Sequence, residues 1–254
     1  MIRFDNVTKR FGRQTVLDGV SYEIRKGEVF SIVGPSGTGK SVSLKHMVRL
    51  LTPDSGAVWV GDRCISAAPD RDLAAIRARF GYLFQSAALL AWMTVYENVA
   101  LPLRETRRMP EGEVRDRVMD ALEKVGLADH GAKYPSDISG GMQKRAGLAR
   151  AIVTEPEIVL YDEPTSGLDP VTSRRIDELI ADLRGRLGIT SVVVTHDMHS
   201  ALTVSDRILM LGGGHVVELS APAEFVRSER PEVRAFLDAQ FITRRGRWET
   251  AARP

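Results

Sequence analysis

Hydrophobic and polar positions along this chain follow two periods, and the change from one period to the other divides the sequence. Residues 2–8 and 16–24 alternate between apolar and polar side chains, as half-buried strands do, whereas Val29–Val33 is almost entirely apolar, as in a strand covered on both faces. A glycine-rich turn and a helix over about 41–51 follow that strand. The same signals predict further strands at 57–60, 80–84, 158–161, 190–195, 207–211 and 216–219.

Between residues 86 and 154 the strand signals stop and helical periodicity replaces them. The clearest stretch is 113–125, where apolar residues recur at helical spacing. Strands and helices alternate on both sides of this block, which predicts an α/β fold with a mainly parallel sheet and a helical subdomain inserted at about 86–156. We therefore expect a main domain over 1–220, followed over 221–254 by a C-terminal helix and a basic extension.

Composition narrows the class of protein. The 254 residues include 35 Lys plus Arg and 33 Asp plus Glu, so the net charge is only +2, which argues against a general polyanion binder. The single cysteine, Cys64, excludes an intrachain disulfide. No apolar run reaches the roughly 18 residues of a membrane span, and the charged start does not resemble a signal peptide. If the protein works at a membrane, we expect another chain to carry the spans.

The most specific motif is the glycine-rich stretch at 34–41, between a buried strand and a helix. Glycines let successive backbone N–H groups curl around a phosphate at the positive end of a helix dipole. Lys40 would supply a point charge to the β- and γ-phosphates, and Ser41 would supply a hydroxyl to Mg²⁺. The predicted nucleotide-binding residues are Gly34, Pro35, Ser36, Gly37, Thr38, Gly39, Lys40 and Ser41.

Two carboxylates follow the apolar strand at 158–161. Parallel sheets place ligands at the C-terminal ends of their strands, which is where Asp162 and Glu163 are expected. There Asp162 could bind Mg²⁺ through water, and Glu163 could polarise an attacking water molecule. An apolar strand that ends in an acid is common by itself, but with a phosphate loop in the same chain the pattern favours a hydrolytic site.

A second helix start, at 139–143, has the sequence Ser-Gly-Gly-Met-Gln. A serine cap followed by two glycines is typical of an anion-binding helix N-terminus, although an ordinary capped helix would look the same. One helix start already serves the phosphate loop, so a second one needs an explanation.

The order of these motifs resembles that of ATP-binding-cassette (ABC) ATPases, over about residues 2–236. The motifs that carry the resemblance are the phosphate loop, Gln85, the motif at 139–143, Asp162 with Glu163, the stretch Ser166-Gly-Leu-Asp169 and His196. It implies a phosphate-loop ATPase with an antiparallel β region beside the parallel sheet. In that family two copies associate head to tail, and each ATP lies between the phosphate loop of one copy and the second motif of the other. This arrangement explains the second helix start.

The resemblance also implies a role for each site residue. Glu163, His196 and Gln85 would be catalytic, with Gln85 sensing Mg²⁺ and the attacking water and His196 contacting the γ-phosphate. Phe11 would stack on adenine, and Asp169 would lie in the loop that communicates across the dimer. Mg²⁺ would be bound through Ser41, Gln85 and Asp162, and the other copy's nucleotide through Ser139, Gly140, Gly141, Met142 and Gln143. ATP and Mg²⁺ are therefore the expected cofactors.

Some residues depart from the family pattern or have ordinary alternatives. In the family, the second motif often reads Leu-Ser-Gly-Gly-Gln. In this chain Ile138 takes the place of the leucine, and Gln143 comes one position after the usual glutamine. Gly167 stands where alanine is frequent, and neither change removes a polar ligand. Phe11 would alternatively pack in the core. His196 with His199 lacks the third ligand of a metal site.

Shorter stretches resemble the ATPases of bacterial lipid transporters of the maintenance-of-lipid-asymmetry (Mla) and mammalian-cell-entry (MCE) types. They are Phe-Gln-Ser-Ala-Ala-Leu at 84–89, Pro-Leu-Arg-Glu at 102–105, Ser-Gly-Gly-Met-Gln-Lys-Arg at 139–145 and Phe-Leu-Asp at 236–238. This resemblance implies an energy subunit, peripheral to the cytoplasmic face of the bacterial inner membrane. Its ATP hydrolysis would move phospholipid or another hydrophobic molecule across the cell envelope.

By the same resemblance, the partners would be a second copy, integral-membrane permease subunits, a substrate-binding MCE-type protein and a small cytoplasmic regulatory subunit, with no nucleic acid. Three alternatives stay open: an ABC importer for a polar solute, a soluble ABC ATPase of DNA repair or translation, and an unrelated phosphate-loop kinase. The second class usually adds coiled coils, zinc modules or another ATPase domain. The third accounts for neither the motif at 139–143 nor the carboxylates at 162–163.

Two segments are predicted to contact partners. Residues 86–104 start just after Gln85 and include an apolar stretch, 87–93, that we expect to dock on a permease unless it packs inside the helical block. Residues 241–248 combine two aromatic residues with three arginines, types that anchor interfaces, and are expected to cross to the second copy. A frayed end and a contact with membrane headgroups are the alternatives for this tail.

Overall fold

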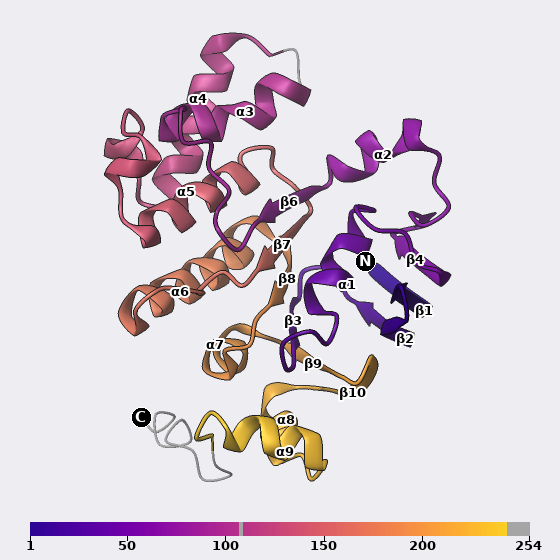
Figure 1. The fold of residues 1–254 in the computed structure, drawn as a ribbon. Coiled ribbons are helices and arrows are strands. Elements are labelled where there is room, and N and C mark those ends of the chain that lie inside the picture. Colours follow the sequence, from indigo (N-terminus) through magenta and orange to yellow (C-terminus); the bar gives the residue numbers. More distant parts are fainter. Residues whose placement is uncertain (107–108, 243–254) are drawn as a thin grey trace.

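A six-stranded sheet occupies the centre of the structure, a computed structural model that describes residues 1–106 and 109–242 (Figure 1). Its strand order is β10-β9-β3-β8-β7-β6, and all neighbours are parallel except β10 and β9. The strands are β3 (Val29–Val33), β6 (Phe80–Leu83), β7 (Ile158–Asp162), β8 (Thr190–Val194), β9 (Arg207–Gly212) and β10 (His215–Ser220). Strands β3 and β8 are buried at every residue, because other elements cover both faces of the sheet.

A smaller antiparallel sheet has the order β2-β1-β4-β5. Its strands are β1 (Ile2–Phe11), β2 (Gln14–Ile24), β4 (Ser55–Val60) and β5 (Arg63–Cys64). In β1, buried Ile2 and Phe4 alternate with exposed residues, as the period-two pattern predicts. Helix α1 (Lys40–Met47) packs between the two sheets, where Leu44 and Met47 share one core with Phe4 and Leu160.

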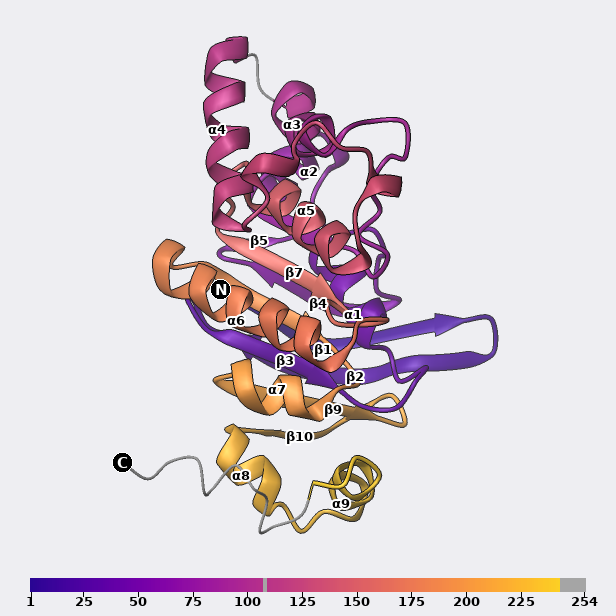
Figure 2. The same cartoon turned by 90° about the vertical axis from the view of Figure 1, so that its left-hand side faces the viewer.

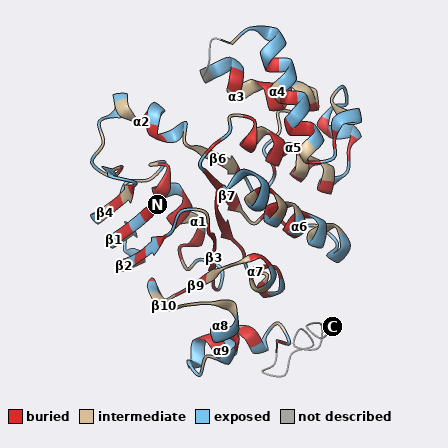
Figure 3. Ribbon diagram, turned by 180° about the vertical axis from the view of Figure 1, so that it is seen from behind, coloured by how far each residue is buried: buried red, intermediate tan, exposed pale blue. Residues whose placement is uncertain are grey.

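Helices α5 (Gly140–Ile152) and α6 (Pro170–Leu187) pack against the opposite face of the central sheet, and α3 (Val95–Thr106) and α4 (Glu111–Lys124) pack against α5 (Figure 2). Their apolar faces pack around Leu83, Tyr161 and Val193, while the outer faces of α4 and α6 are largely exposed (Figure 3). Helices α3 to α5 and the 3₁₀ turns Ala128–His130 and Pro135–Asp137 all lie between β6 and β7 in the chain. The predicted fold class, a mainly parallel sheet with an antiparallel region and inserted helices, is confirmed.

Three further helices follow β8 in the chain. They are α7 (Met198–Val204), α8 (Pro222–Arg227) and α9 (Pro231–Asp238), and they share a third core with Val33, Ile208 and Met210. Ile242 also belongs to this core and is 3% exposed, whereas Phe241 beside it is 92% exposed. Helix α2 (Asp70–Arg77), which the periodicity does not predict, joins β5 to β6.

Within the two described ranges, none of the helices has both the length and the apolar character needed to cross a bilayer. The proposed division of the chain at residue 220 stays a prediction. Residues 243–248 of the predicted interface tail lie outside the described residues.

Candidate functional site

The phosphate loop connects β3 to α1, and its shape depends on glycine. Gly34, Gly37 and Gly39 have φ angles of 139°, 82° and 96°, a region that other residues rarely adopt. A Cβ atom would lie 2.2 Å from the carbonyl oxygen of Leu211 if added to Gly34, and 2.6 Å from Leu17 Cδ2 if added to Gly39. These contacts are too short for any side chain. The loop therefore has the tight curl of an anion-binding backbone.

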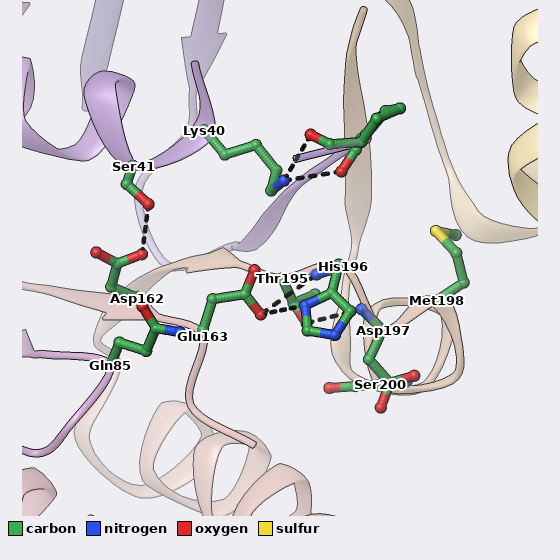
Figure 4. Close-up of polar contacts among 12 residues, drawn as sticks. Lys40, Ser41, Gln85, Asp162, Glu163, Thr195, His196, Asp197, Met198 and Ser200 are labelled. Carbon is green, nitrogen blue, oxygen red and sulfur yellow. Dashed lines mark hydrogen bonds and ion pairs between the residues drawn. The ribbon is translucent and has the colours of Figure 1, made fainter. Parts of the chain in front are cut away.

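Lys40 lies inside this curl and is only 8% exposed. Its Nζ donates to the carbonyl oxygens of Gly34 at 2.8 Å and Pro35 at 2.9 Å (Figure 4). Burial lowers the pKa of Lys40, while the negative charges of Glu163 and Asp162 act in the opposite direction. A buried ammonium group at this position can form charge-assisted hydrogen bonds with phosphate oxygens.

Ser41 and Asp162 are in contact although they lie 121 residues apart in the sequence. Ser41 Oγ donates to Asp162 Oδ1 at 2.8 Å, and the hydroxyl of Tyr82 donates to Oδ2 of the same carboxylate at 3.3 Å. A hydroxyl and a carboxylate therefore meet at the C-terminal edge of the sheet. Oxygen donors of these kinds are the ones that Mg²⁺ prefers, so the residues present fit a magnesium ion.

Glu163 and His196 lie against each other beyond the ends of β7 and β8. Nδ1 of His196 lies 2.8 Å from Glu163 Oε2, and the backbone N–H of His196 donates to the same oxygen at 3.4 Å. Glu163 has a φ of 50°, in the left-handed region that is strained for a side chain with a Cβ. Its backbone N–H donates to the carbonyl oxygen of Val194 at 2.8 Å, so the neighbouring strand stabilises this turn.

Lys144, which the sequence patterns do not single out, joins the site from α5. It is 5% exposed, and its Nζ donates to the carbonyl oxygen of Gln85 and, at 3.0 Å, to that of Glu163. Burial lowers the pKa of Lys144 against the opposing charges of Glu163 and Asp162. Lys144 therefore links the Gln85 backbone to the end of β7.

A sequence signal for Lys144 does exist. The residue lies three positions after Gly141 and four before Leu148, within the buried stripe of α5. A charged side chain in such a stripe requires polar partners, because an unpaired buried charge is costly.

The backbone after Gln85 is also held by α5. The guanidinium group of Arg150 donates to the carbonyl oxygens of Ala87 at 2.6 Å and Ala88 at 2.7 Å. Both alanines have positive φ angles, 59° and 48°. Two cations of one helix, Lys144 and Arg150, thus fix the course of residues 85–88.

The motif at 139–143 begins α5 and is separate from the phosphate loop of the same chain. Ser139 caps the helix, with its Oγ accepting from the N–H of Met142 at 3.3 Å. A Cβ at Gly141 would lie 2.5 Å from Thr172 Cγ2, so the motif packs closely against α6. The amide of Gln143 donates to the carbonyl oxygen of Pro135 at 2.8 Å. Within the described residues, no hydrogen bond joins residues 139–143 to the phosphate loop.

Asp169 and Phe11 lie apart from the catalytic contacts. Asp169 caps α6, and hydrogen bonds from the hydroxyl and N–H of Thr172 and the N–H of Val171 lower its pKa. Phe11 ends β1 and is 46% exposed, so the alternative that it packs in the core is wrong. Its stacking on adenine stays a prediction.

One open cavity of about 1150 Å³ joins several of these segments. It is lined by 34–36 of the phosphate loop, by 165–168 and by His196, and from the C-terminal segment by Phe236 and Gln240. The structure brings Lys40, Ser41, Gln85, Asp162, Glu163 and His196 to one edge of the sheet. Within the described residues, no hydrogen bond joins the side chains of these residues to the motif at 139–143 or to Phe11.

Known proteins resemble this chain in sequence. The family model described as "ABC transporter" matches residues 17–166. A probable ribonucleotide transport ATP-binding protein of Mycobacterium leprae is 43% identical over 241 residues, which cover 95% of this chain and 70% of that protein. A methionine import ATP-binding protein of Caulobacter vibrioides is 43% identical over 226 residues, which cover 88% of this chain and 68% of that protein.

Solved structures resemble it in fold. A dimeric ATP-binding cassette, MJ0796, in a post-hydrolysis state bound to ADP and Pi, superposes with a TM-score of 0.80 at 36% identity, covering 87% of this chain and 99% of that chain. The cbiO1 protein of Clostridium perfringens, part of the cbiONQ ABC transporter complex, has a TM-score of 0.83 at 28% identity, with 94% of each chain covered.

Proposed function

Because this chain belongs to the ABC transporter family, we propose that two copies of it drive permease subunits that move phospholipid or another hydrophobic molecule across the bacterial cell envelope. Family membership makes the chain an ATP-binding subunit that hydrolyses ATP and uses Mg²⁺, as the sequence predicts. The residue roles, the transported molecule and the docking sites are proposals.

The proposed hydrolytic centre rests on one observation: the contact between Glu163 and His196 lies beside the Ser41–Asp162 contact at the mouth of the phosphate loop. Lys40 would bind phosphate oxygens, and Ser41 and Asp162 would hold Mg²⁺. Glu163 polarises the attacking water, and His196 orients that carboxylate and contacts the γ-phosphate. When bound, Mg²⁺ neutralises charge on the phosphates.

We propose that a second copy completes each nucleotide site through its residues 139–143. These residues offer a capped helix start with two glycines, suited to an anion, yet within residues 1–106 and 109–242 they form no hydrogen bond with the phosphate loop of their own chain. The related cassette bound to ADP and Pi is dimeric, which supports this arrangement.

The transported molecule is the least constrained part of the proposal. The relatives' names specify ribonucleotide transport and methionine import, so a polar-solute importer is the second candidate. The stretches at 84–89, 102–105 and 139–145 support the lipid candidate by their resemblance to Mla- and MCE-type ATPases. That candidate places the chain on the cytoplasmic face of the inner membrane, with an MCE-type protein and a small regulatory subunit as further partners.

We propose that the permease docks on residues 86–104, centred on Trp92. Within the apolar stretch Ala87 is buried and Leu89 packs against the helical core, whereas Trp92 is 73% exposed. The buried Asn98 shapes this loop: its Oδ1 accepts from the N–H of Leu90 at 2.7 Å, and its Nδ2 donates to the carbonyl oxygens of Leu90, Met93 and Thr94. The hydrogen bonds of Asn98 therefore hold the loop in a conformation in which Trp92 is exposed.

The experiment that tests this function is isolation of the intact membrane complex with this chain tagged. Mass spectrometry should identify integral-membrane subunits and co-purified phospholipid, and ATP hydrolysis by the complex should rise when lipid is supplied. A complex with a solute-specific permease and no retained lipid would favour the polar-solute importer instead.

A further inference from the structure

Gln240, just after the C-terminal helix α9, hydrogen-bonds the backbone on both sides of residue 197. Its Oε1 accepts from the N–H of Met198 at 2.9 Å, and its Nε2 donates to the carbonyl oxygen of His196 at 2.9 Å. Both ends of one side-chain amide therefore bind one short stretch of backbone, the stretch that carries His196.

Buried side chains and backbone hydrogen bonds hold the chain on both sides of Gln240. On α9, Val233 and Leu237 are fully buried in the third core, which also contains Met198 and Ile242. The N–H groups of Gln240 and Ile242 both donate to the carbonyl oxygen of Leu237, at 3.0 and 3.1 Å. The chain is thus fixed before and after Gln240, so its amide has a defined position.

The N–H group of Met198, which Gln240 satisfies, has no acceptor inside α7. Met198 is the first residue of that helix, and the first N–H groups of a helix lack an intrahelical acceptor. The side chain of the cap residue Asp197 accepts from the N–H groups of His199 at 2.9 Å and Ser200 at 3.2 Å. The N–H of Met198 is instead bound by Gln240. Met198 is fully buried, so loss of the amide would leave a buried donor unpaired, which is costly.

The imidazole of His196 is positioned by its backbone more than by packing. Its side chain is 63% exposed, and in the part of the chain that the structure describes its ring is hydrogen-bonded to Glu163 alone. A shift of the backbone at 196–198 would therefore change the distance between Nδ1 and the Glu163 carboxylate, because little else restrains the ring.

We propose that Gln240 is a positioning residue for ATP hydrolysis, which sets His196 against Glu163 and couples α9 to the hydrolytic centre. The proposal rests on the proposed role of His196. Any partner that displaces α9 would then change the hydrolysis rate through this link, with no contact to the nucleotide.

The first test compares Gln240→Met with Asp238→Asn in the complete complex. Methionine preserves length and shape without an amide, whereas Asp238→Asn weakens only the exposed ion pair with Arg234 on the same helix. We expect kcat to fall about tenfold in Gln240→Met with KM for ATP within about twofold, and no change in Asp238→Asn. Gln240→Glu, which places a second acceptor opposite the His196 carbonyl, should also lower kcat.

The second test asks whether Gln240 acts through His196. Gln240→Met should add no further loss of kcat in a His196→Ala background, since coupled residues are not additive. An equal fractional loss in both backgrounds would overturn the proposal. If His196→Ala hydrolyses ATP at the wild-type rate, the proposed role of His196 fails instead.

A third measurement does not depend on hydrolysis. Hydrogen exchange of the Met198 amide, without nucleotide, should be faster in Gln240→Met than in the wild type and unchanged in Asp238→Asn. Wild-type exchange in Gln240→Met would refute the link whether or not the protein is an efficient ATPase.

Discussion

The carboxylate of Glu163 contacts the imidazole of His196, with Oε2 2.8 Å from Nδ1, although the two residues follow different strands. Strands β7 and β8 pair in parallel with Asp162 opposite Val194, so the residues after them leave the same edge of the sheet. Strand pairing therefore builds this contact, and each side chain orients the other.

Replacement of the Glu163 carboxylate should abolish most ATP hydrolysis while ATP binding is retained. Glu163→Gln keeps the shape of the side chain and loses its charge, so ATP should still bind while hydrolysis falls at least about 100-fold. An ATP-bound dimer should accumulate, which size-exclusion chromatography with ATP would detect. A monomer at every concentration, both alone and in the full complex, would contradict the site shared between two copies.

Removal of the Lys40 ammonium group should greatly weaken nucleotide binding. Lys40→Ala removes a buried, charge-assisted donor, and we expect ATP affinity to fall by about 100-fold or more. Titration with a fluorescent nucleotide measures this, and Lys45→Ala, an exposed change on the same helix, is the matched control. If Lys40→Ala binds ATP with wild-type affinity, the phosphate loop is not the nucleotide-binding site.

Lys144 should affect both stability and turnover. Lys144→Met fills the same space but leaves the carbonyl oxygens of Gln85 and Glu163 without this donor, at a cost of about 1–3 kcal/mol in the free energy of unfolding. ATP hydrolysis should fall about tenfold, because the Gln85 segment is no longer fixed to β7. Lys124→Met, at a surface ion pair of α4, should change neither quantity in urea unfolding and ATPase assays.

The proposed docking segment, residues 86–104, should cross-link to the permease from position 91. In a Cys64→Ser background, Ala91→Cys places a thiol beside the exposed Trp92, whereas Lys26→Cys places one in the turn between β2 and β3. We expect cross-links to a co-expressed permease from position 91 and none from position 26. Thr94 is a poorer position, since its hydroxyl bonds Glu97 at the start of α3. An assembled complex without a cross-link at 91 would refute docking there.

Asp177 should make folding stability depend on pH. Burial raises its pKa from 3.8 to about 6, with Asp197 and Glu178 adding to the shift and a hydrogen bond from Ser200 opposing it. Between about pH 4 and pH 6 the folded chain retains a proton that the unfolded chain has released. The stability that this group contributes is therefore fully present below pH 4 and is lost as the pH rises through 6. The loss in the free energy of unfolding is at most about 3 kcal/mol.

Asp177→Asn retains the acceptor for Ser200 and removes the titration. Its stability relative to the wild type, from urea unfolding, should be higher at pH 7 than at pH 4.5. Asp182→Asn, at an exposed ion pair on the same helix, serves as the control. Parallel pH curves for Asp177→Asn and the wild type would show that this carboxyl does not titrate as described.

The sequence alone predicted the parts of this protein that depend on neighbours in the chain. The buried strand Val29–Val33, the glycine curl of the phosphate loop and a C-terminal helix within 221–254, which in the structure begins at Pro231, all follow from local rules of periodicity, glycine geometry and capping. The carboxylates at the end of β7 were predictable for the same reason, because parallel strands share one functional edge.

Only the tertiary structure decided which distant partners these elements meet. Lys144 contacts Gln85 across 59 residues, Ser41 contacts Asp162 across 121, and Gln240 contacts His196 across 44. Periodicity indicates which side chains face inward, and burial requires a polar group to have a partner, but neither identifies that partner. Strand order and helix packing select it, and they also decide that Ala87 is buried while Trp92 of the same apolar stretch faces outward.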